Sequence, residues 1–247
     1  MDLKTYLNEI EAFIKDYLVT SKQKGYVLGL SGGVDSSLVS VLTKNAVGKD
    51  KLYCVMIPID SLKADLDDAL YLCKEMDLNY EIIDASDVYH NYLASFETKG
   101  IELDTATKSN LKARIRMSIL YAIAQKRNSL VIGTDNADET YVGYFTKYGD
   151  GGVDLLPIVY LTKGETVLAS KLVGIPTRLA ERVPSAGLFE GQTDESEMGI
   201  KYADLDDYVL GKTVSLEAKN RIDHLHNISE HKRNPIPRPK PFIRDDK

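Results

Sequence analysis

The apolar positions of the chain recur with two spacings, one typical of buried strands and the other of amphipathic helices. Four short apolar runs predict strands at residues 25–31, 51–59, 80–83 and 130–134. Helical spacing predicts helices at residues 3–17, 36–46, 60–76, 88–96 and 105–126. Strands that alternate with helices predict a parallel sheet, because each crossover helix must cover one of its faces. The expected fold class is therefore α/β, with a doubly wound, Rossmann-like parallel sheet flanked by helices in three layers.

In sheets of this kind, ligands bind beyond the carboxyl ends of the strands. We therefore expect the binding site in the loops that follow the first, second and fourth strands. After residue 136 the pattern predicts Gly-rich loops that alternate with short helices. The Pro-rich residues 234–241 cannot be helical and are expected to lie extended over the surface. We interpret residues 1–247 as a single domain that ends in an extended tail at residues 235–247.

Composition narrows the class of protein. The formal net charge of −6 over 247 residues argues against a surface built to bind nucleic acid. No apolar run approaches the ~20 residues that span a bilayer, and the acidic first helix lacks the core of a signal peptide. Cys54 and Cys73 have no metal-ligand spacing around them and are expected to be buried, reduced thiols. We expect a soluble, cytoplasmic protein without a membrane or nucleic-acid partner.

Residues 29–36 (GLSGGVDS) join the first predicted strand to a helix and form the most informative motif. Gly32 and Gly33 permit a tight turn whose backbone N–H groups can contact an anion. The serine hydroxyls of the motif and the positive end of the following helix add further donors. Asp35 would repel a phosphate unless it held Mg²⁺ against it. The motif is neither a Walker A loop nor GxGxxG, and the alternative interpretation is an ordinary Gly-Gly turn with a polar helix cap.

This motif resembles the SGGxDS loop of the N-type ATP pyrophosphatases, and nearly the whole chain is similar to the ammonia-dependent NAD synthetases. The further segments that carry the similarity are NLKARIRM at 110–117, GTDNADE at 133–139, GYFTKYGDGGVDLLP at 143–157, LTKGE at 161–165, VPSAGL at 183–188 and HKR at 231–233. The chain departs from many members of the family in having Ser185 for Thr and Gly187 for Asp. A hydroxyl remains at position 185, so only an acidic role at position 187 is in doubt.

The resemblance implies a ligase that amidates deamido-NAD (nicotinate adenine dinucleotide) to NAD with ammonia. The reaction would pass through a NAD-adenylate intermediate and release AMP and pyrophosphate. The family also implies Mg²⁺ as cofactor, ATP as co-substrate and a homodimer. The chain is too short to add a glutaminase domain, and neither cysteine has the Glu/Lys/Cys setting of a nitrilase-type glutaminase. Free ammonia is therefore the expected nitrogen donor.

The resemblance further implies roles for residues on the ATP side. Asp35 and Glu139 match the metal ligands, although Glu139 alone would be explained as a stabiliser of a helix N-terminus. Asp35, Lys163 and Asp154 are expected to act in catalysis, with Asp154 as a candidate base for the attacking ammonium. The residues expected to contact ATP are Gly29, Leu30, Ser31, Gly32, Gly33, Val34, Asp35, Ser36, Thr134, Lys163 and Ser185.

On the other side, deamido-NAD is expected to contact Arg116, Tyr144, Lys147, Asp154, His231 and Lys232. Arg116 lies at the flank of the apolar stripe of its predicted helix, where it reaches either a pocket rim or solvent. Tyr144 offers a flat surface for stacking on the pyridine ring, and Tyr148 is its competitor. In the alternative interpretation, the aromatic residues belong to the core and the glycines to an ordinary loop.

Two rival functions remain open. Another N-type pyrophosphatase, such as a tRNA-thiolating or GMP-synthesising enzyme, is disfavoured by the acidic charge, by the absence of CxxC pairs and by residues 147–154. A nucleotide-binding sensor of similar fold would carry out no chemistry. Such a sensor would not need Asp35, Glu139 and Lys163 together.

Overall fold

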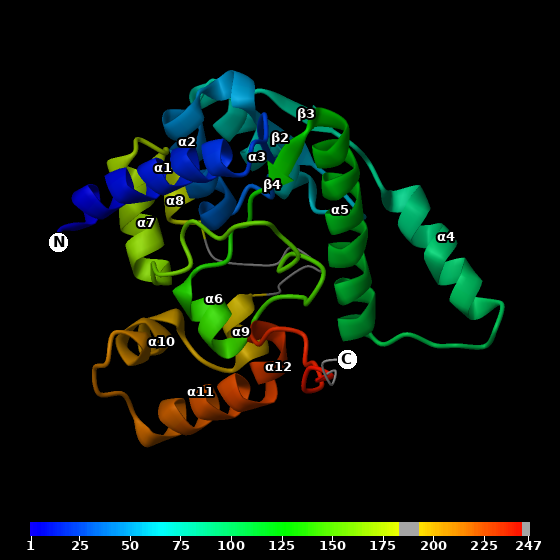
Figure 1. Ribbon diagram of the computed structural model, residues 1–247. Coiled ribbons are helices and arrows are strands. Elements are labelled where there is room, and N and C mark those ends of the chain that lie inside the picture. The colour runs from blue at the N-terminus through cyan, green and yellow to red at the C-terminus, as the bar shows by residue number, and fades with distance from the viewer. Residues whose placement is uncertain (183–192, 244–247) are drawn as a thin grey trace.

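A four-stranded parallel sheet with the strand order β3-β2-β1-β4 forms the centre of the molecule (Figure 1). The computed structural model describes residues 1–182 and 193–243. The strands are β1 (Gly25–Gly29), β2 (Leu52–Met56), β3 (Tyr80–Ile82) and β4 (Ser129–Val131). All four predicted strands are therefore confirmed, and with them the α/β class.

The strands are shorter than the apolar runs that predict them. Residues 30–31, 57–58 and 132–134 leave the ladder at the carboxyl ends of β1, β2 and β4 and line a cavity. Ile132 still pairs with Leu155 through a parallel bridge, which extends the sheet beyond β4. The other edge is β3, whose residues are exposed. The apolar runs thus continue past the sheet because they also build the floor of the cavity.

Helices cover one face of the sheet and share one hydrophobic core with it. They are α1 (Leu3–Thr20), α2 (Val34–Val47), α3 (Lys63–Glu75), α7 (Lys163–Leu172) and α8 (Thr177–Ala180). The buried residues of α1 are Leu7, Ile10, Ile14 and Leu18, which is the spacing of one helix face. The amphipathic first helix predicted from the sequence is therefore confirmed.

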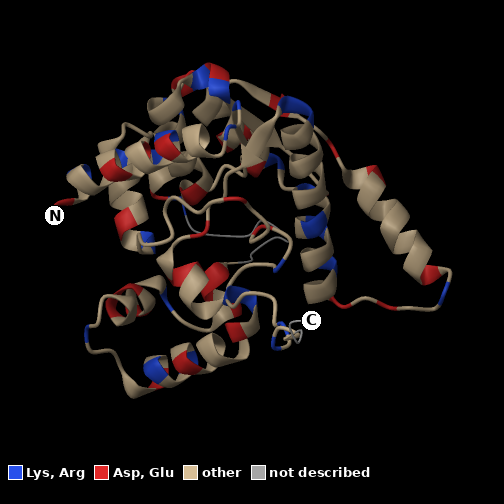
Figure 2. Cartoon of the chain, viewed as in Figure 1, with Lys and Arg blue, Asp and Glu red and all other residues tan. Residues whose placement is uncertain are grey.

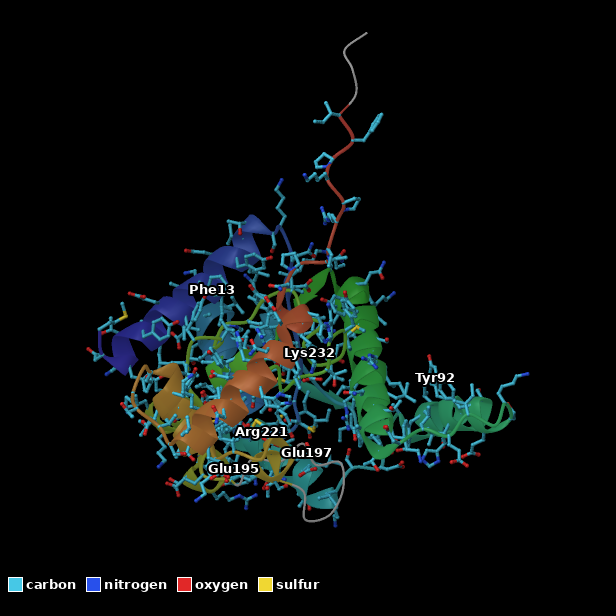
Figure 3. The ribbon with its side chains drawn as sticks, turned by 90° about the horizontal axis from the view of Figure 1, so that it is seen from below. Phe13, Tyr92, Glu195, Glu197, Arg221 and Lys232 are labelled. Atoms are coloured by element: carbon cyan, nitrogen blue, oxygen red, sulfur yellow. The ribbon has the colours of Figure 1, made fainter. Side chains whose placement is uncertain are left out.

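The opposite face is covered by α5 (Thr105–Arg127), which packs on β1 and β4. The neighbouring helix α4 (Ser86–Glu97) stands away from the body, and Figure 3 shows Tyr92 on this outlying arm. Only Tyr89 of α4 is buried, whereas Val88 and Tyr92 are 47% and 49% exposed. Both predicted helices are confirmed, but the projecting position of α4 is not encoded in its spacing.

A separate group of short helices lies below the carboxyl ends of the strands (Figure 1). They are α6 (Ala137–Val142), α9 (Asp194–Met198), α10 (Tyr202–Val209), α11 (Leu216–Ile228) and α12 (Glu230–Arg233). They enclose a core of their own around Val142, Leu205 and Ile222. The predicted change to short helices after residue 136 is therefore confirmed.

Acidic and basic positions are interspersed along the helices of the surface (Figure 2). Cys54 and Cys73 are buried free thiols, and burial raises the pKa of Cys73 to about 12. No helix in the described part of the chain is long and apolar enough to cross a membrane. Residues 235–243 form no helix or strand, and Figure 3 shows them leading away from the body rather than over its surface.

Candidate functional site

A cavity of about 710 Å³ lies where the carboxyl ends of the strands face the group of short helices. The loops after β1, β2 and β4 form its floor, as the topology predicts. One wall is the cavity-facing side of α5, and another is the glycine-rich segment 143–153. Lys163, Arg182 and Asp194 also belong to the lining. The cavity therefore joins parts of the chain that lie far apart in the sequence.

The loop between β1 and α2 has the form of an anion-binding turn. Gly33 is the N-cap of α2, so the first free N–H groups of that helix follow the turn. The Ser31 and Ser36 hydroxyl oxygens lie 3.0 Å apart, and Gly33 N–H donates to Ser31 Oγ at 3.2 Å. Gly32 has φ +82°, and a Cβ there would lie 2.6 Å from the carbonyl oxygen of Asp65. The loop therefore requires glycine at position 32 and directs the positive end of α2 at the cavity.

Three charged side chains from separate elements meet beside this loop. Lys163 Nζ lies 2.7 Å from Asp35 Oδ2 and 3.0 Å from Glu139 Oε1. Burial would lower the pKa of Lys163, but the two carboxylates outweigh it and raise that pKa. Burial also raises the pKa of Glu139 to about 7, against the opposing effect of Lys163. One ammonium thus faces two carboxylates. When both carboxylates are ionised, the cluster has a net negative charge that a further cation can neutralise.

Asn136 positions both carboxylates of this cluster. Its side-chain oxygen accepts from Glu139 N–H at 3.0 Å, and the Glu139 carboxylate accepts from Asn136 N–H. The two bonds form a capping box on α6. Its amide nitrogen donates to Asp35 Oδ1 at 2.9 Å. We did not predict a role for this residue, although the Asn-x-x-Glu spacing of a capping box is readable in the sequence.

A second capping box fixes Lys163 as the first residue of α7. Thr162 accepts from Glu165 N–H at 3.3 Å, and Glu165 accepts from Thr162 N–H at 2.9 Å. The backbone N–H of Lys163 donates to Asp138 at 2.6 Å. The N-terminal amides of α7 therefore have partners, and the Lys163 side chain starts from a fixed point.

Two tyrosines, the buried Tyr202 and the half-buried Tyr144, connect the cluster to α9. Tyr202 O–H donates to Asp194 at 3.0 Å and lies 3.4 Å from Glu139 Oε1. Tyr144 O–H donates to Asp194 at 3.3 Å and to Glu197. Burial raises the pKa of both tyrosines, so they remain protonated donors. We did not predict Asp194 or Tyr202, because no motif marks them in the sequence.

Two further cationic groups belong to the cavity lining. Arg116 donates through Nε to the Ile57 carbonyl at 3.0 Å and through Nη2 to Ser61 Oγ at 3.2 Å. Lys232, on α12 near the centre of the view in Figure 3, donates to two carbonyls of residues 143–145 at 2.7 Å. Burial lowers the pKa of both cations. Arg116 thus reaches the cavity, which was one of its two predicted positions.

Two further carboxyl groups line the cavity, and no role was predicted for either. Asp135 is only 5% exposed, whereas Asp150 is accessible within the cavity and accepts from Thr146 N–H at 3.1 Å. Burial raises the pKa of both carboxyl groups. Asp150 also attracts Arg116 and Lys232 electrostatically. The cavity lining therefore contains acidic groups as well as cations.

Three predicted residues lie apart from the cavity lining. Asp154 accepts from Val131 N–H at 2.7 Å and from Tyr121 O–H at 3.2 Å. Lys147 donates to the carbonyl oxygen of His231, and His231 is an exposed residue. Roles for Asp154, Lys147 and His231 remain predictions.

Most of the predicted residues do line the one cavity. These are Gly29, Leu30, Ser31, Gly33, Val34, Asp35, Ser36, Arg116, Thr134, Glu139, Tyr144, Lys163 and Lys232. Gly32 shapes the loop from behind. Ser185 and Gly187 lie outside the described residues.

A parallel sheet whose first strand-to-helix loop presents amides and hydroxyls to a cavity defines a nucleotide-binding α/β protein. The comparisons with known proteins specify it further, since a family model described as NAD synthase matches residues 6–236. The chain therefore belongs to the NAD synthase family, and it is a ligase. The resemblance inferred from the motifs is confirmed.

Individual relatives agree with this assignment. The NH(3)-dependent NAD(+) synthetase of Mesoplasma florum is 44% identical over 250 residues, which cover 99% of this chain and 100% of that protein. Among solved structures, an NMN synthetase from Francisella tularensis has a TM-score of 0.92 and 38% identity, covering 97% of this chain and 99% of that one. An NH3-dependent NAD synthetase from Campylobacter jejuni has a TM-score of 0.79 and 30% identity, covering 99% and 100%.

Proposed function

We propose that this protein amidates the nicotinate carboxylate of deamido-NAD with ammonia, using ATP and releasing AMP and pyrophosphate. The observation that carries the proposal is the meeting of Asp35, Glu139 and Lys163 beside the phosphate loop. The lining of the same cavity also contains Arg116 and Lys232, which suit an anionic nucleotide.

The first step activates the carboxylate, which is a poor acyl donor because it lacks a good leaving group. A nicotinate oxygen attacks the α-phosphorus of ATP, and the bond from that phosphorus to the pyrophosphate oxygen breaks. Negative charge then grows on the pyrophosphate beside the α2 N-terminus, where the loop amides and Lys163 stabilise it. The product of this step is an acyl adenylate.

In the second step ammonia attacks the carbonyl carbon of the adenylate. The bond from that carbon to the AMP oxygen breaks, and the nitrogen loses a proton to give the amide. We retain Asp154 as the candidate base named from the sequence, although it already accepts two hydrogen bonds. Asp154→Asn with unchanged ammonia turnover would remove it from this role.

Mg²⁺ fits the oxygen donors of the site. Asp35 and Glu139 lie on the first turns of two different helices, α2 and α6, and both contact one common cation, the Lys163 ammonium. Magnesium is commonly held by one or two carboxylates together with substrate phosphates. We propose that Asp35 and Glu139 hold it, where it would neutralise phosphate charge. Asn136 would keep the Asp35 carboxylate in place.

A second acceptor is favoured by one comparison. The similar Francisella tularensis structure is named an NMN synthetase, so the acceptor to test beside deamido-NAD is nicotinate mononucleotide. Both acceptors present the same carboxylate and differ in the adenylate half. They therefore require the same phosphate loop but different contacts elsewhere in the cavity.

We further propose a homodimer, as implied by the sequence resemblance. The α4 arm leaves Val88 and Tyr92 exposed, and Ile101 in the following loop is 50% exposed. Apolar side chains on one projecting element are suited to contact a second copy. Light scattering of the purified protein tests this, and a monomeric mass at micromolar concentration would contradict it.

The decisive experiment incubates the purified protein with ATP, Mg²⁺, ammonium and either acceptor, and follows amide and AMP by chromatography. Equal amounts of NAD and AMP from deamido-NAD support the proposal. Preferential turnover of nicotinate mononucleotide supports the second acceptor instead. AMP without amide would indicate another N-type pyrophosphatase, and neither product despite ATP binding would indicate a sensor. Amide formed from glutamine in place of ammonium would overturn the choice of nitrogen donor.

A further inference from the structure

Arg182 lies beside the phosphate loop, and none of the binding or catalytic roles proposed above involves it. It follows α8 and lines the cavity. Its Nη1 lies 3.5 Å from the carbonyl oxygen of Gly32, within the loop, and 3.3 Å from Asp68 Oδ2. Its Nη2 donates to Asp65, on the first turn of α3. A guanidinium is therefore fixed against the turn that is expected to receive phosphates.

The contacts of Arg182 leave part of its hydrogen-bonding capacity unused. Among the described residues they engage Nη1 and one side of Nη2, so Nε–H and the second Nη2 hydrogen remain for another acceptor. The side chain is 25% exposed, and the surface that it exposes contributes to the cavity lining. A planar guanidinium is well suited to bind two phosphate oxygens at once.

A neighbouring arginine shows what a purely structural link between the same helices looks like. Arg178, on α8, pairs with Asp68 at 2.8 Å and lies over the Tyr71 ring at 4.0 Å from its centroid. It is 58% exposed and is not among the cavity-lining residues. Both arginines thus join α8 to α3, but only Arg182 also contacts the phosphate loop.

We propose that Arg182 binds the pyrophosphate part of ATP, on the α3 side of the loop and apart from Lys163. The assignment rests on the proposed function, because it supposes that the loop receives a nucleoside triphosphate. It adds a second cation to stabilise the leaving pyrophosphate when the bond to the α-phosphorus breaks.

The test measures binding without turnover, by calorimetry with ATP, inorganic pyrophosphate and AMP in the presence of Mg²⁺. Arg182→Met should weaken ATP and pyrophosphate binding by about tenfold to a hundredfold, as for loss of charge-assisted hydrogen bonds. AMP lacks the leaving group, so its affinity should not change. Arg182→Lys should restore part of the pyrophosphate affinity.

Two matched variants separate this role from a structural one. Arg178→Met removes the other link to α3 and should leave all three affinities unchanged. Asp65→Asn removes the ion pair but also a carboxylate near the phosphates, so pyrophosphate should bind at least as tightly as in the wild type. If Arg182 were only structural, Asp65→Asn and Arg182→Met would weaken binding alike, and that result would overturn the assignment.

The remaining outcomes also decide the question. Unchanged pyrophosphate binding in Arg182→Met refutes the assignment even when the wild type forms the amide. Equal loss of ATP and AMP binding refutes it as well, because the defect would not be at the pyrophosphate. If Arg182→Met does not fold, Arg182→Lys and Asp65→Asn still distinguish the two roles. A phosphate-binding Arg182 predicts that Asp65→Asn binds pyrophosphate at least as tightly as the wild type, whereas a structural Arg182 predicts weaker binding. If the wild type forms no amide but Arg182→Met still weakens pyrophosphate binding as expected, only the proposed reaction is refuted.

Discussion

Asp138 and Asp206 each accept a hydrogen bond from one of the first two backbone N–H groups of α7. Lys163 N–H donates to Asp138 Oδ2 at 2.6 Å, and Gly164 N–H donates to Asp206 Oδ2 at 2.9 Å. The Oδ1 atoms of both carboxyl groups are buried and have no hydrogen-bond partner among the described residues, and Asp206 helps to raise the pKa of Asp138. A proton held between them satisfies both atoms, so the pair caps the helix that begins with Lys163.

This pair predicts how stability depends on pH. Burial, with a contribution from Asp206, raises the pKa of Asp138 from 3.8 to about 9. The folded state therefore holds a proton that the unfolded state releases over this range, and stability falls as pH rises through it. In Asp138→Asn the amide should replace the shared proton and accept from Lys163 N–H. This variant should lose less stability than the wild type between about pH 6 and about pH 9.

The measurement is urea unfolding of both proteins at the two pH values, in buffer with a chelator. Asp206→Ala provides the contrast, because it leaves Asp138 without its partner and should be less stable at both pH values. An identical loss of stability in the wild type and in Asp138→Asn would show that Asp138 does not take up the proton.

Lys163→Met should separate the electrostatic roles of the charge cluster. The substitution leaves the Asp35 and Glu139 carboxylates close together and buried, which costs about 3–5 kcal/mol when a partner is removed from a buried ion pair. Mg²⁺ can take the place of the ammonium, so it should raise the melting temperature of the variant more than that of the wild type. Amide formation should fall by about 10²-fold or more, because one stabilising group for the phosphates is missing.

Calorimetric unfolding with and without Mg²⁺ checks this prediction. Lys171→Met is the matched control on the same helix, since Lys171 forms an exposed pair with Glu181 and should contribute less than about 1 kcal/mol. A variant whose melting temperature does not respond to Mg²⁺ would argue against Asp35 and Glu139 as the metal ligands.

Asn136 should be needed for more than its helix cap. Asn136→Asp preserves a good N-cap acceptor for α6 but turns a third carboxylate towards Asp35. We expect Asn136→Asp to be more stable than Asn136→Ala by about 1 kcal/mol, because it keeps the cap, and yet to bind Mg²⁺–ATP more weakly than the wild type. Unfolding free energies and ATP titrations distinguish the two effects. Equal ATP affinity in Asn136→Asp and the wild type would leave the residue with a capping role alone.

The sequence was most informative where local chemistry determines structure. Buried runs and helical spacing predicted the elements of the sheet, and the Gly-Gly turn after β1 was readable because few residues adopt such a backbone. The loops that form the cavity followed from the parallel topology. The pairing of Asp35 with Lys163 joins positions 128 residues apart, so only the family resemblance brought them together.

The residues that were missed share a physical reason. Asp194, Tyr202 and Asp206 act through contacts with distant elements, and they lie on short helices whose spacing is not distinctive. Asp135 stands in a recognised motif, but its near-complete burial appears only once the cavity is assembled. The outlying position of α4 was also not predictable, because its amphipathic pattern is the same as that of a packed helix.

Gly32→Ala and Gly33→Ala should differ sharply although the residues are adjacent. At Gly32 the backbone has φ +82°, and a Cβ would lie 2.6 Å from the Asp65 carbonyl oxygen and 3.2 Å from Ala69 N. Left-handed backbone alone costs about 1–2 kcal/mol for a residue with a Cβ, and the contact forces the loop away from α3. At Gly33 φ is −78°, and a Cβ would meet only Ser31 Oγ at 3.3 Å. We therefore expect Gly32→Ala to be the less stable variant by about 1–3 kcal/mol and to lose ATP affinity. Urea unfolding and ATP titration of the pair check this, and equal stability of the two variants would show that the turn does not depend on the contact with α3.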